Sequence, residues 1–544
     1  MKAGSALLAP LLLASTHAAA QAASEPIGNG VVAPAPALAR PAGKRCVVEL
    51  FARRAFQGDT PLPIAYRPPA DCPGTWSKVV LEADFDVTTG TQFDRTADLT
   101  LGGTTLFVGT TMEPDATYAP HWHVERDLTD YAALLHQPAD GAATLVNYVD
   151  TEHDAQAFWG ARLVFYAGDA PDPSRILVPV TAGFARLDPQ QRMVARTLTL
   201  PRNLTRVAID LFAIGQEREE FWYDCAPGNL ALRNVFGPPP CAAPFRDVEV
   251  LIDGQLAGVR SVQPAIFTGG INPALWRRAP ALDALNLPSA RVDLTPFAGL
   301  LNDGKPHVVA LAMPMAGSFF RVSATLIGEV DPDRAVVPGA LIANTLAPAK
   351  APTRQVRPPR APGAIGTIET VATRAAFAEG YVETSRGRVT TRVAYALDQR
   401  LITTRDTGKS SKRYDAHQSI TVTTHGGEPT RRRIDEHDTL VIDIGVKPPL
   451  YGVKNGTRIT QSSERTVTGA GDRDTHTLQT ITSFAPSFSL FIDAKPTPNR
   501  VTVTSLVEDA NGRRQVEAVV ADDQVTRSER DLGATPSARV LAKP

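Results

Sequence analysis

Three stretches of the sequence place carboxylates next to arginine or aromatic residues, a combination suited to acid–base chemistry on a polar substrate. The first is Phe93-Asp94-Arg95. An arginine next to Asp94 in the chain can hold the carboxylate ionised, or can bind substrate oxygens beside it. The alternative is a surface ion pair at the edge of a strand. We take Asp94 as a candidate catalytic carboxylate and Arg95 as a candidate substrate-binding residue.

The second stretch is Tyr148–Asp154, in which Asp150, Glu152 and Asp154 are three acids within five positions. The alternative to a site is a solvated loop. Asp150 is a candidate for the catalytic set, with Glu152 as its rival and as a candidate for binding substrate.

The third stretch runs through Glu219 and Glu220 into Phe221-Trp222-Tyr223. Sugar rings have apolar faces and hydroxyl-rich edges, so aromatic rings beside carboxylates are typical of a carbohydrate site. We take Glu220 as a second catalytic carboxylate, Glu219 as a substrate-binding residue, and Trp222 or Trp122 as a stacking surface.

The sequence gives less support to a metal site or to catalysis by a nucleophilic side chain. His121-Trp122-His123 places two imidazoles on one face of a strand, with His153 as a conceivable third ligand, but no spacing typical of a zinc enzyme accompanies them. The sequence contains no G-x-S-x-G elbow and no phosphate-binding loop. We therefore expect neither a metal nor a cofactor.

Charge and the N-terminus narrow the functional classes. The 544 residues include 56 basic and 57 acidic side chains, a balance that argues against a nucleic-acid binder. A basic start, an apolar stretch and small residues near Ala20 and Ala23 predict a signal peptide over residues 1–23. No later stretch approaches the ~20 apolar residues of a membrane span. We expect a secreted or periplasmic monomer with no membrane partner.

The four cysteines are Cys46, Cys72, Cys225 and Cys241. In an exported protein they can pair, and the short spacings favour Cys46–Cys72 and Cys225–Cys241. Three pairings exist in principle, and four buried thiols are the alternative.

Alternating apolar and polar residues predict strands almost throughout, as in Leu81–Val87. Glycine-rich turn signals separate the segments, and no run of βαβ units is present. The further strand candidates are 144–149, 161–166, 207–212, 248–252, 321–327, 388–397, 419–424, 439–444 and 501–506. Many short strands favour an all-β fold built from β-sandwiches or jelly rolls.

The length requires several domains. We expect two adjacent jelly rolls, residues 24–170 and 171–345, to form the catalytic unit. A proline-rich linker follows at residues 346–365. Residues 366–544 then form a separate all-β accessory domain without obvious chemistry.

From about Cys46 to Val330, a range that includes the three carboxylate-containing stretches, the sequence resembles the peptide-N-glycosidase A family of glycoamidases. The shared blocks occur in one order along the chain. They are Phe93-Asp94-Arg95, Glu113-Pro114, Val124–Tyr131, Glu219–Tyr223, Phe245–Val248, Asp253-Gly254, Phe267–Pro273, Trp276-Arg277, Asp293–Phe297 and Asp303–His307.

A weaker similarity extends to the flavobacterial F-type enzymes, which consist of two side-by-side jelly rolls with the active site at their junction. Asp94-Arg95 matches an Asp-Arg pair there, and Asp150 stands where that type has a glutamate. Glu220 matches an acid on the second roll, and Arg277 or Arg278 matches an arginine downstream. The cysteines that flank this acid in the F-type enzymes are absent around Glu220.

The resemblance implies hydrolysis of the bond between an asparagine side chain and the first N-acetylglucosamine of a glycan. The partners would be N-glycosylated peptides and proteins. Asp94 would be the principal carboxylate, Glu220 would assist from the facing roll, and Arg95 with Arg277 or Arg278 would donate to the carbonyl or the peptide. An endo-acting glycosidase and a non-catalytic carbohydrate-binding protein remain the alternatives.

Overall fold

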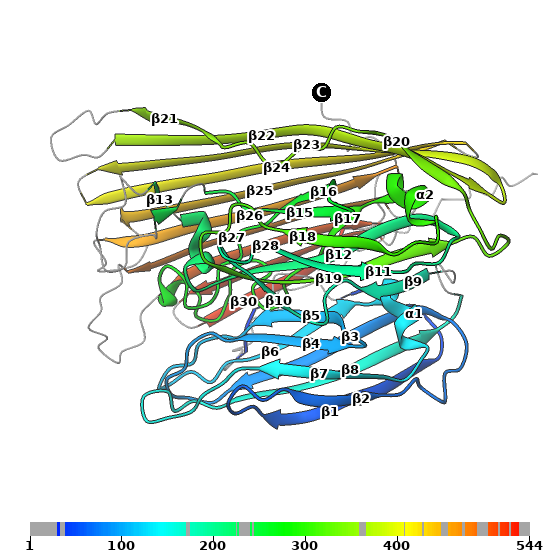
Figure 1. The fold of residues 1–544 in the computed structure, drawn as a ribbon. Coiled ribbons are helices and arrows are strands. Elements are labelled where there is room, and N and C mark those ends of the chain that lie inside the picture. Colours follow the sequence, from blue (N-terminus) through cyan, green and yellow to red (C-terminus); the bar gives the residue numbers. More distant parts are fainter. Residues whose placement is uncertain are drawn as a thin grey trace, which may run out of the picture.

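The computed structural model is built almost entirely from β-strands (Figure 1). It describes residues 30–532, apart from residues 33–37, 170–174, 225, 228–239, 242–243, 358–365, 407, 427–428, 448–454, 470–473, 487–498, 510–511 and 522–523. The predicted signal peptide and Cys225 lie outside the described residues. The predicted Cys46–Cys72 disulfide is present. Every helix among the described residues is too short or too polar to cross a membrane.

The first body is a jelly roll of eight strands (Figure 1). Its two sheets have the orders β1-β8-β3-β6 and β2-β7-β4-β5, which is the double Greek-key order of this fold. The strands are β1 (Arg45–Ala55), β2 (Leu62–Tyr66), β3 (Trp76–Val87), β4 (Thr96–Leu101), β5 (Thr104–Thr110), β6 (His121–Asp127), β7 (Ala139–Leu145) and β8 (Ala157–Ala167), with η1 (Thr129–Tyr131) and α1 (Ala132–Leu135) between β6 and β7.

The second body repeats this topology. Its sheets are β10-β19-β12-β17, with β9 added beside β19, and β11-β18-β15-β16. The strands are β9 (Arg175–Pro179), β10 (Ala185–Leu187), β11 (Met193–Leu198), β12 (Leu204–Gln216), β15 (Asp247–Ile252), β16 (Gln255–Ser261), β17 (Ala290–Asp293), β18 (His307–Ala312) and β19 (Phe319–Val330). The connections contain η2 (Glu217–Asp224), β13 (Ala226–Pro227), β14 (Pro240–Cys241), η3 (Pro273–Leu275), η4 (Thr295–Phe297) and α2 (Ala298–Leu301).

Sequence signals account for much of this layout. Gly102 and Gly103 have φ of 54° and 80°, and Asp253-Gly254 have 49° and 78°. Positive φ at both central residues matches the twist of a two-residue hairpin, so these pairs turn β4 into β5 and β15 into β16. The strand predicted at 144–149 is wrong beyond Leu145, because β7 ends there.

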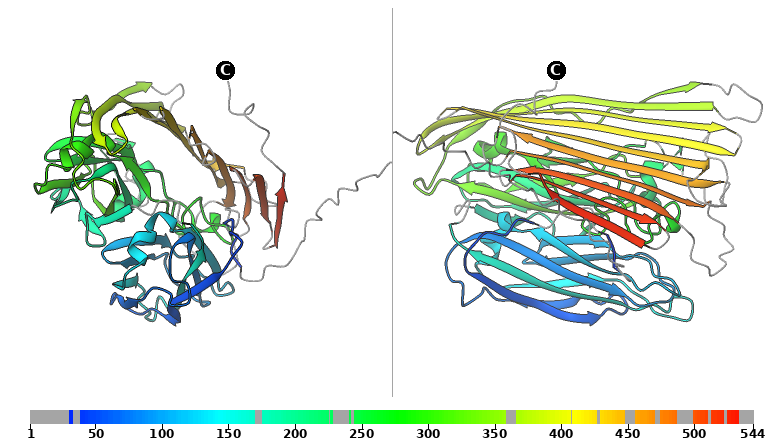
Figure 2. Two further views of the ribbon diagram at one scale, coloured as in Figure 1. Left: turned by 90° about the vertical axis from the view of Figure 1, so that its right-hand side faces the viewer. Right: turned by 180° about the vertical axis from the view of Figure 1, so that it is seen from behind.

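The third body is one antiparallel sheet of eleven strands that curves along the second jelly roll (Figure 2). From β22 onward every strand pairs with the next one in the chain, whereas β20 and β21 both pair with β22. The strands are β20 (Gly339–Asn344), β21 (Thr353–Arg357), β22 (Gly366–Thr384), β23 (Gly387–Asp406), β24 (Lys409–His425), β25 (Thr430–Val446), β26 (Gly456–Thr468), β27 (Thr475–Pro486), β28 (Arg500–Asp509), β29 (Gly512–Ala521) and β30 (Gln524–Asp531).

The predicted division at residues 345 and 365 does not match this sheet. Strand β20 precedes the predicted linker and β21 lies inside it, yet both belong to the third sheet. The two proline-flanked segments add to the edge of the sheet instead of spacing two domains apart.

The described part of residues 366–544 does not pack as a separate domain either. One hydrophobic core includes Ile209 and Leu326 of the second roll together with Leu440 and Ile481 of the third sheet. A single sheet has two faces and needs a partner to bury one of them. The second jelly roll supplies that partner, so the two bodies share one core.

We therefore expect that truncation after Asn344 destabilises the protein. The cut exposes apolar side chains of the second roll, each worth about 1.5–3 kcal/mol when buried, so the Tm should fall by about 10 °C or more. Truncation after Leu532, beyond the last described strand, is the control. Calorimetry of both proteins checks this, and equal Tm values would show that the third sheet is dispensable for the rolls.

Candidate active site

Asp94 lies at the junction of the two jelly rolls, just before β4. The backbone of Arg95 extends the β4–β5 ladder by one step, since its N–H donates to Thr111 Oγ1 and its carbonyl accepts from the N–H of Thr111, both at 2.8 Å. This pairing puts Asp94 beside Glu113, and the N–H of Asp94 donates to Glu113 Oε1 at 3.3 Å. Two acids 19 positions apart thus become neighbours.

A loop of the second roll closes over this pair. The N–H of Gly269 donates to Asp94 Oδ2 at 3.0 Å, and Thr268 Oγ1 donates to the carbonyl of Thr111 at 2.8 Å. A Cβ on Gly269 would lie 2.4 Å from Glu113 Oε1 and 3.2 Å from Asp94 Oδ1. Only glycine lets the backbone come this close to both carboxyl groups.

Glu220 reaches the same place from η2, directly after β12. The chain turns sharply there, with φ of 54° at Glu217. A Cβ on Gly215 would lie 2.0 Å from the carbonyl oxygen of Glu219, so β12 and η2 fold back on each other at a glycine. Glu220 interacts electrostatically with both Asp94 and Glu113.

The three carboxyl groups hold their protons unusually strongly. Burial, followed by the charge of Asp94, raises the pKa of Glu113 to about 8. Burial, followed by the charges of Asp94 and Glu113, raises the pKa of Glu220 to about 8. Burial also raises the pKa of Asp94, but the N–H of Gly269 and the charge of Arg95 oppose this shift. Asp94 is therefore the member of the cluster most readily ionised.

Tyr223 lies next to the cluster and is buried. Burial, then the charges of Glu220, Asp224 and Asp94, raises its pKa well above the ordinary value. Within the described part of the chain its hydroxyl has no hydrogen-bond partner. The phenol is thus a neutral donor beside the carboxyl groups.

Arg95 lies close to Asp94, but its guanidinium donates two hydrogen bonds to Gln92 Oε1, at 3.2 and 2.7 Å. Its guanidinium also lies 5.6 Å from the centre of the Phe93 ring. Arg95 consequently supports Asp94 electrostatically and is only partly available to a substrate.

Glu219, predicted to bind substrate, is buried and bonded within the protein. Its buried carboxylate accepts from Arg246 Nε and Nη2 at 2.7 and 3.0 Å, and from the N–H groups of Gly317 and Ser318 at 2.6 and 2.9 Å. Both carboxylate oxygens are thus bonded within the protein, which anchors η2.

The two tryptophans predicted as stacking surfaces are also buried. Trp122 is 5% exposed and stacks on Phe85 inside the first roll, with ring centres 5.2 Å apart. Trp222 is 3% exposed and meets Tyr414 of the third sheet edge to face. Neither offers an open face to a sugar ring.

Asp150 and Glu152 lie in an exposed loop and do not join the carboxylate cluster. Asp150 Oδ1 accepts from the N–H groups of Glu152 and His153 at 2.8 and 2.7 Å, and these bonds lower the pKa of Asp150. This bonding is a local turn motif. It sets the loop at the rim of the site, where His153 contacts Phe93 with ring centres 4.7 Å apart.

Arg277 and Arg278 both lie against Tyr118, with guanidinium carbons 4.9 and 4.6 Å from the ring centre. Arg277 also forms an ion pair with Asp115. The turn that contains Asp115 and Tyr118 follows Glu113, so these arginines hold the second roll against the back of the site.

Sequence reasoning missed two features of this site. In the sequence, Glu113 was noted only within a block shared with the glycoamidases. Its position just after a hairpin, opposite Asp94, could have indicated that it belongs to the site. Phe93 is 53% exposed and Tyr148 is 49% exposed, and both rings belong to the first roll. Both stand in the stretches already selected for their carboxylates.

Sequence comparisons identify relatives of this chain. The family model described as "Peptide N-acetyl-beta-D-glucosaminyl asparaginase amidase A" matches residues 39–329. The "Peptide-N4-(N-acetyl-beta-glucosaminyl)asparagine amidase A" of Prunus dulcis is 30% identical over 293 residues, which cover 49% of this chain and 51% of that protein. This chain thus spans about half the length of that relative.

Two solved structures are also similar. One is described as a peptide-N(4)-(N-acetyl-beta-D-glucosaminyl) asparagine amidase, with TM-score 0.37, 12% identity, and coverage of 53% of this chain and 96% of that one. The other is PNGF-II, with TM-score 0.35, 12% identity, and coverage of 53% and 66%. The family match covers more than half of the chain, and the protein therefore belongs to the peptide N-acetyl-β-D-glucosaminyl asparaginase amidase A family.

Proposed function

We propose that this protein hydrolyses the amide bond between an asparagine side chain and the first N-acetylglucosamine of N-glycosylated peptides and proteins. The observation that carries the proposal is the cluster of Asp94, Glu113 and Glu220 at the junction of two jelly rolls. Family membership supports the same reaction. The products are a glycosylamine, which later loses ammonia, and a peptide with aspartate in place of asparagine.

Asp94 has the properties of the general base. Water must lose a proton as its oxygen attacks the carboxamide carbon, and a base helps most when it is ionised and within reach. Asp94 is half-buried and receives the N–H of Gly269, which favours its ionised form. Arg95 favours the same form through its charge.

Glu220 has the properties of the general acid. The carbon–nitrogen bond breaks more easily once the nitrogen accepts a proton, because an amide anion is a poor leaving group. With a pKa of about 8, Glu220 carries a proton at neutral and acidic pH. Two carboxyl groups whose surroundings separate their proton affinities can thus divide the acid and base roles. Glu113 is also protonated at these pH values, so its carboxyl group adds no negative charge next to Asp94.

The ring of Phe93, next to Asp94 in the chain, is exposed, and so is the ring of Tyr148, whose backbone carbonyl accepts from Gln92 Nε2 at 3.0 Å. An aromatic face packs against the apolar face of a sugar or against a peptide side chain. We place the substrate between this rim on the first roll and Glu220 on the second.

The proposal extends to the cellular location. The signal-like N-terminus and the Cys46–Cys72 disulfide support export to the periplasm or the exterior, since disulfides persist in oxidising compartments. We propose that the protein acts there as a monomer.

One glycopeptide separates this function from its alternatives. After incubation with purified protein, an amidase leaves a peptide with aspartate at the former glycosylation site. An endo-acting glycosidase leaves one sugar on the asparagine, and a carbohydrate-binding protein leaves the glycopeptide intact. Mass spectrometry of the peptide product decides among them.

Asp94→Asn should lower turnover by at least about 10²-fold, because the amide cannot take the proton of water. The Tm should stay near that of the wild type. Asp86→Asn is the matched control, since Asp86 pairs with Arg53 on the surface of the first roll, and its loss should cost at most about 1 kcal/mol of stability. Turnover assays with calorimetry check both, and near-normal turnover of folded Asp94→Asn would exclude Asp94 as the base.

The stability of the protein should fall as the pH rises from about 4.5 to 8. In this window folded Glu113 and Glu220 keep protons, with pKa values of about 8, that the unfolded chain, with ordinary values of 4.5, has lost. The free energy of unfolding therefore decreases with pH. Glu113→Gln and Glu220→Gln should each flatten this dependence, which denaturant unfolding at several pH values measures. An unchanged slope in both variants would contradict the raised pKa values.

Phe93→Ala should raise KM about 3- to 10-fold, the loss expected for one aromatic packing surface. The ring contacts the substrate equally before and during the reaction, so kcat should change much less than KM. Phe93→Tyr keeps the ring and should restore KM. Steady-state kinetics on one glycopeptide checks the pair, and a loss confined to kcat would place Phe93 outside the binding surface.

A further inference from the structure

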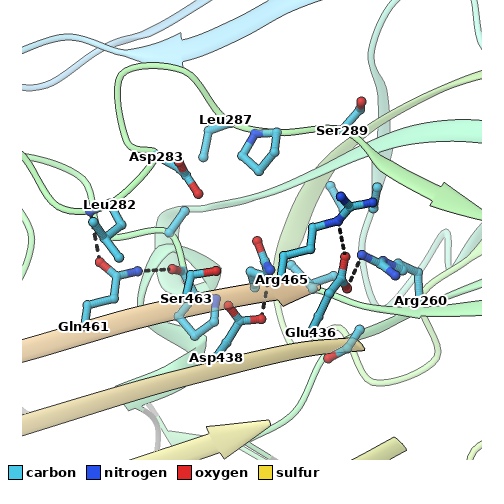
Figure 3. A pocket seen from close by; sticks show the side chains of 18 of the residues that line it. Arg260, Leu282, Asp283, Leu287, Ser289, Glu436, Asp438, Gln461, Ser463 and Arg465 are labelled. Carbon is cyan, nitrogen blue, oxygen red and sulfur yellow. Dashed lines mark hydrogen bonds and ion pairs between the residues drawn. The ribbon is translucent and has the colours of Figure 1, made fainter. Parts of the chain in front are cut away.

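A cavity of about 230 Å³ lies between the second jelly roll and the third sheet (Figure 3). Its walls are the end of β12, the segments that follow β16 and precede β17, and strands β25, β26 and β27. One water occupies ~30 Å³ in the liquid, so the cavity has room for a group much larger than a water molecule. Neither sequence signals nor the family comparison pointed to this place.

The lining mixes hydrogen-bonding groups with apolar surface. Asp283, Asp438 and Gln461 lie along it, and Leu282 and Leu287 supply apolar contacts (Figure 3). Asp438 accepts from Gln263 Nε2 at 2.8 Å and from the Ser463 side chain. No hydrogen bond to the Asp283 carboxylate is found among the described residues. A neutral molecule with hydroxyl groups on its edges and an apolar face matches such walls.

The charges at the cavity do not favour a small ion. Glu436 forms ion pairs with both Arg260 and Arg465. Burial raises the pKa of Asp438 to about 7 and that of Asp283 to about 6. Below these values both side chains are neutral carboxylic acids, which donate and accept hydrogen bonds as sugar hydroxyls require.

The cavity adjoins a smaller cavity, of about 20 Å³, at Glu220. This smaller cavity is lined by Glu220, Trp222 and Phe267. The two cavities share wall residues, namely Ala213, Ile214, Val262, Gln263, Ala265 and Leu287. The shared residues place the larger cavity next to Glu220, on the side of the third sheet.

We propose that this cavity is a subsite for the neutral sugars of the glycan beyond the ring that carries the amide, formed jointly by the second jelly roll and the third sheet. The proposal rests on the proposed amidase function and names the part of the substrate that reaches the third sheet. Asp283 and Asp438 bind hydroxyl groups, and Leu287 packs against a ring face. The third sheet is therefore part of the substrate-binding site.

The test uses the full chain and two glycopeptides with the same peptide. One carries a single N-acetylglucosamine and the other a neutral oligosaccharide of several sugars. The quantity measured is the ratio of kcat/KM for the long glycan to kcat/KM for the single sugar. Asp438→Asn and Asp283→Asn should each lower this ratio about 5- to 10-fold, the effect of one lost or misdirected hydrogen bond. Asparagine suits position 283 because its φ is 61°.

Ser463→Phe fills the cavity while leaving both carboxyl groups in the chain, and it should lower the same ratio at least as much. Asp435→Asn is the matched control. Asp435 lies on the same strand as Asp438, on the opposite face of the sheet because side chains alternate, and pairs with Arg433. The control should leave the ratio unchanged. Calorimetry of each variant verifies that the fold is intact.

The outcomes separate the two proposals. If the wild type releases neither glycan, the proposed amidase function fails. If it releases both but the ratio is the same in wild type, Asp438→Asn, Asp283→Asn and Ser463→Phe, the subsite is overturned while the amidase stands.

Discussion

The structure depends on one segment of the second jelly roll, residues 262–289, being held from two sides. Toward the first roll, a Cβ on Gly109 would lie 2.2 Å from the carbonyl oxygen of Leu285, so β5 and this segment touch backbone to backbone. On the other side, Asn272 Nδ2 donates to the carbonyl of Pro486 at 2.8 Å and Ser483 Oγ to that of Leu275 at 2.6 Å. The N–H of Gly269 reaches Asp94 from within the held segment.

Two adjacent glutamates show how the surroundings decide the state of a buried acid. Glu219 meets Arg246 and two backbone N–H groups, so its charge is compensated where it lies. Glu220 meets two other acids, and a proton compensates instead. Burying an uncompensated charge costs more than binding a proton, which is why the second solution is stable. Glu219 therefore anchors η2, and Glu220 keeps a carboxyl group that can give up a proton.

Much of the fold and part of the site could be predicted from the sequence. Hairpin glycines such as Gly102-Gly103 and alternating strands such as Leu81–Val87 indicated an all-β fold, because these signals are local. The stretches containing Asp94 and Glu220 were selected by composition and by resemblance. Exposure was harder to predict: Trp122 and Trp222 are buried, whereas Phe93 is open to solvent. Burial depends on which faces pack together, and one sequence does not specify that.

The third sheet was the part least predictable from the sequence, for a physical reason. Proline in residues 346–365 indicates that the chain cannot continue a central strand there, which is equally typical of a linker and of a sheet edge. Only the contacts of β20 and β21 with β22 distinguish these two meanings. The contacts of single side chains are equally hard to predict. The carboxamide of Gln461 contacts Pro264 and Leu282, and nothing in the sequence around Gln461 indicates these partners.

The neighbour-to-neighbour pairing of β22 to β30 bears on how the protein folds. A sheet in which each strand pairs with the next along the chain needs only short loop closures, so its hairpins form quickly and can add one after another. The jelly rolls, with strands β1 and β8 adjacent, require distant segments to meet and fold more slowly. The sheet has no second layer of its own, so it gains full stability only when the preceding roll is complete. During synthesis the rolls emerge first, and the finished second roll then serves as the surface on which the remaining hairpins assemble.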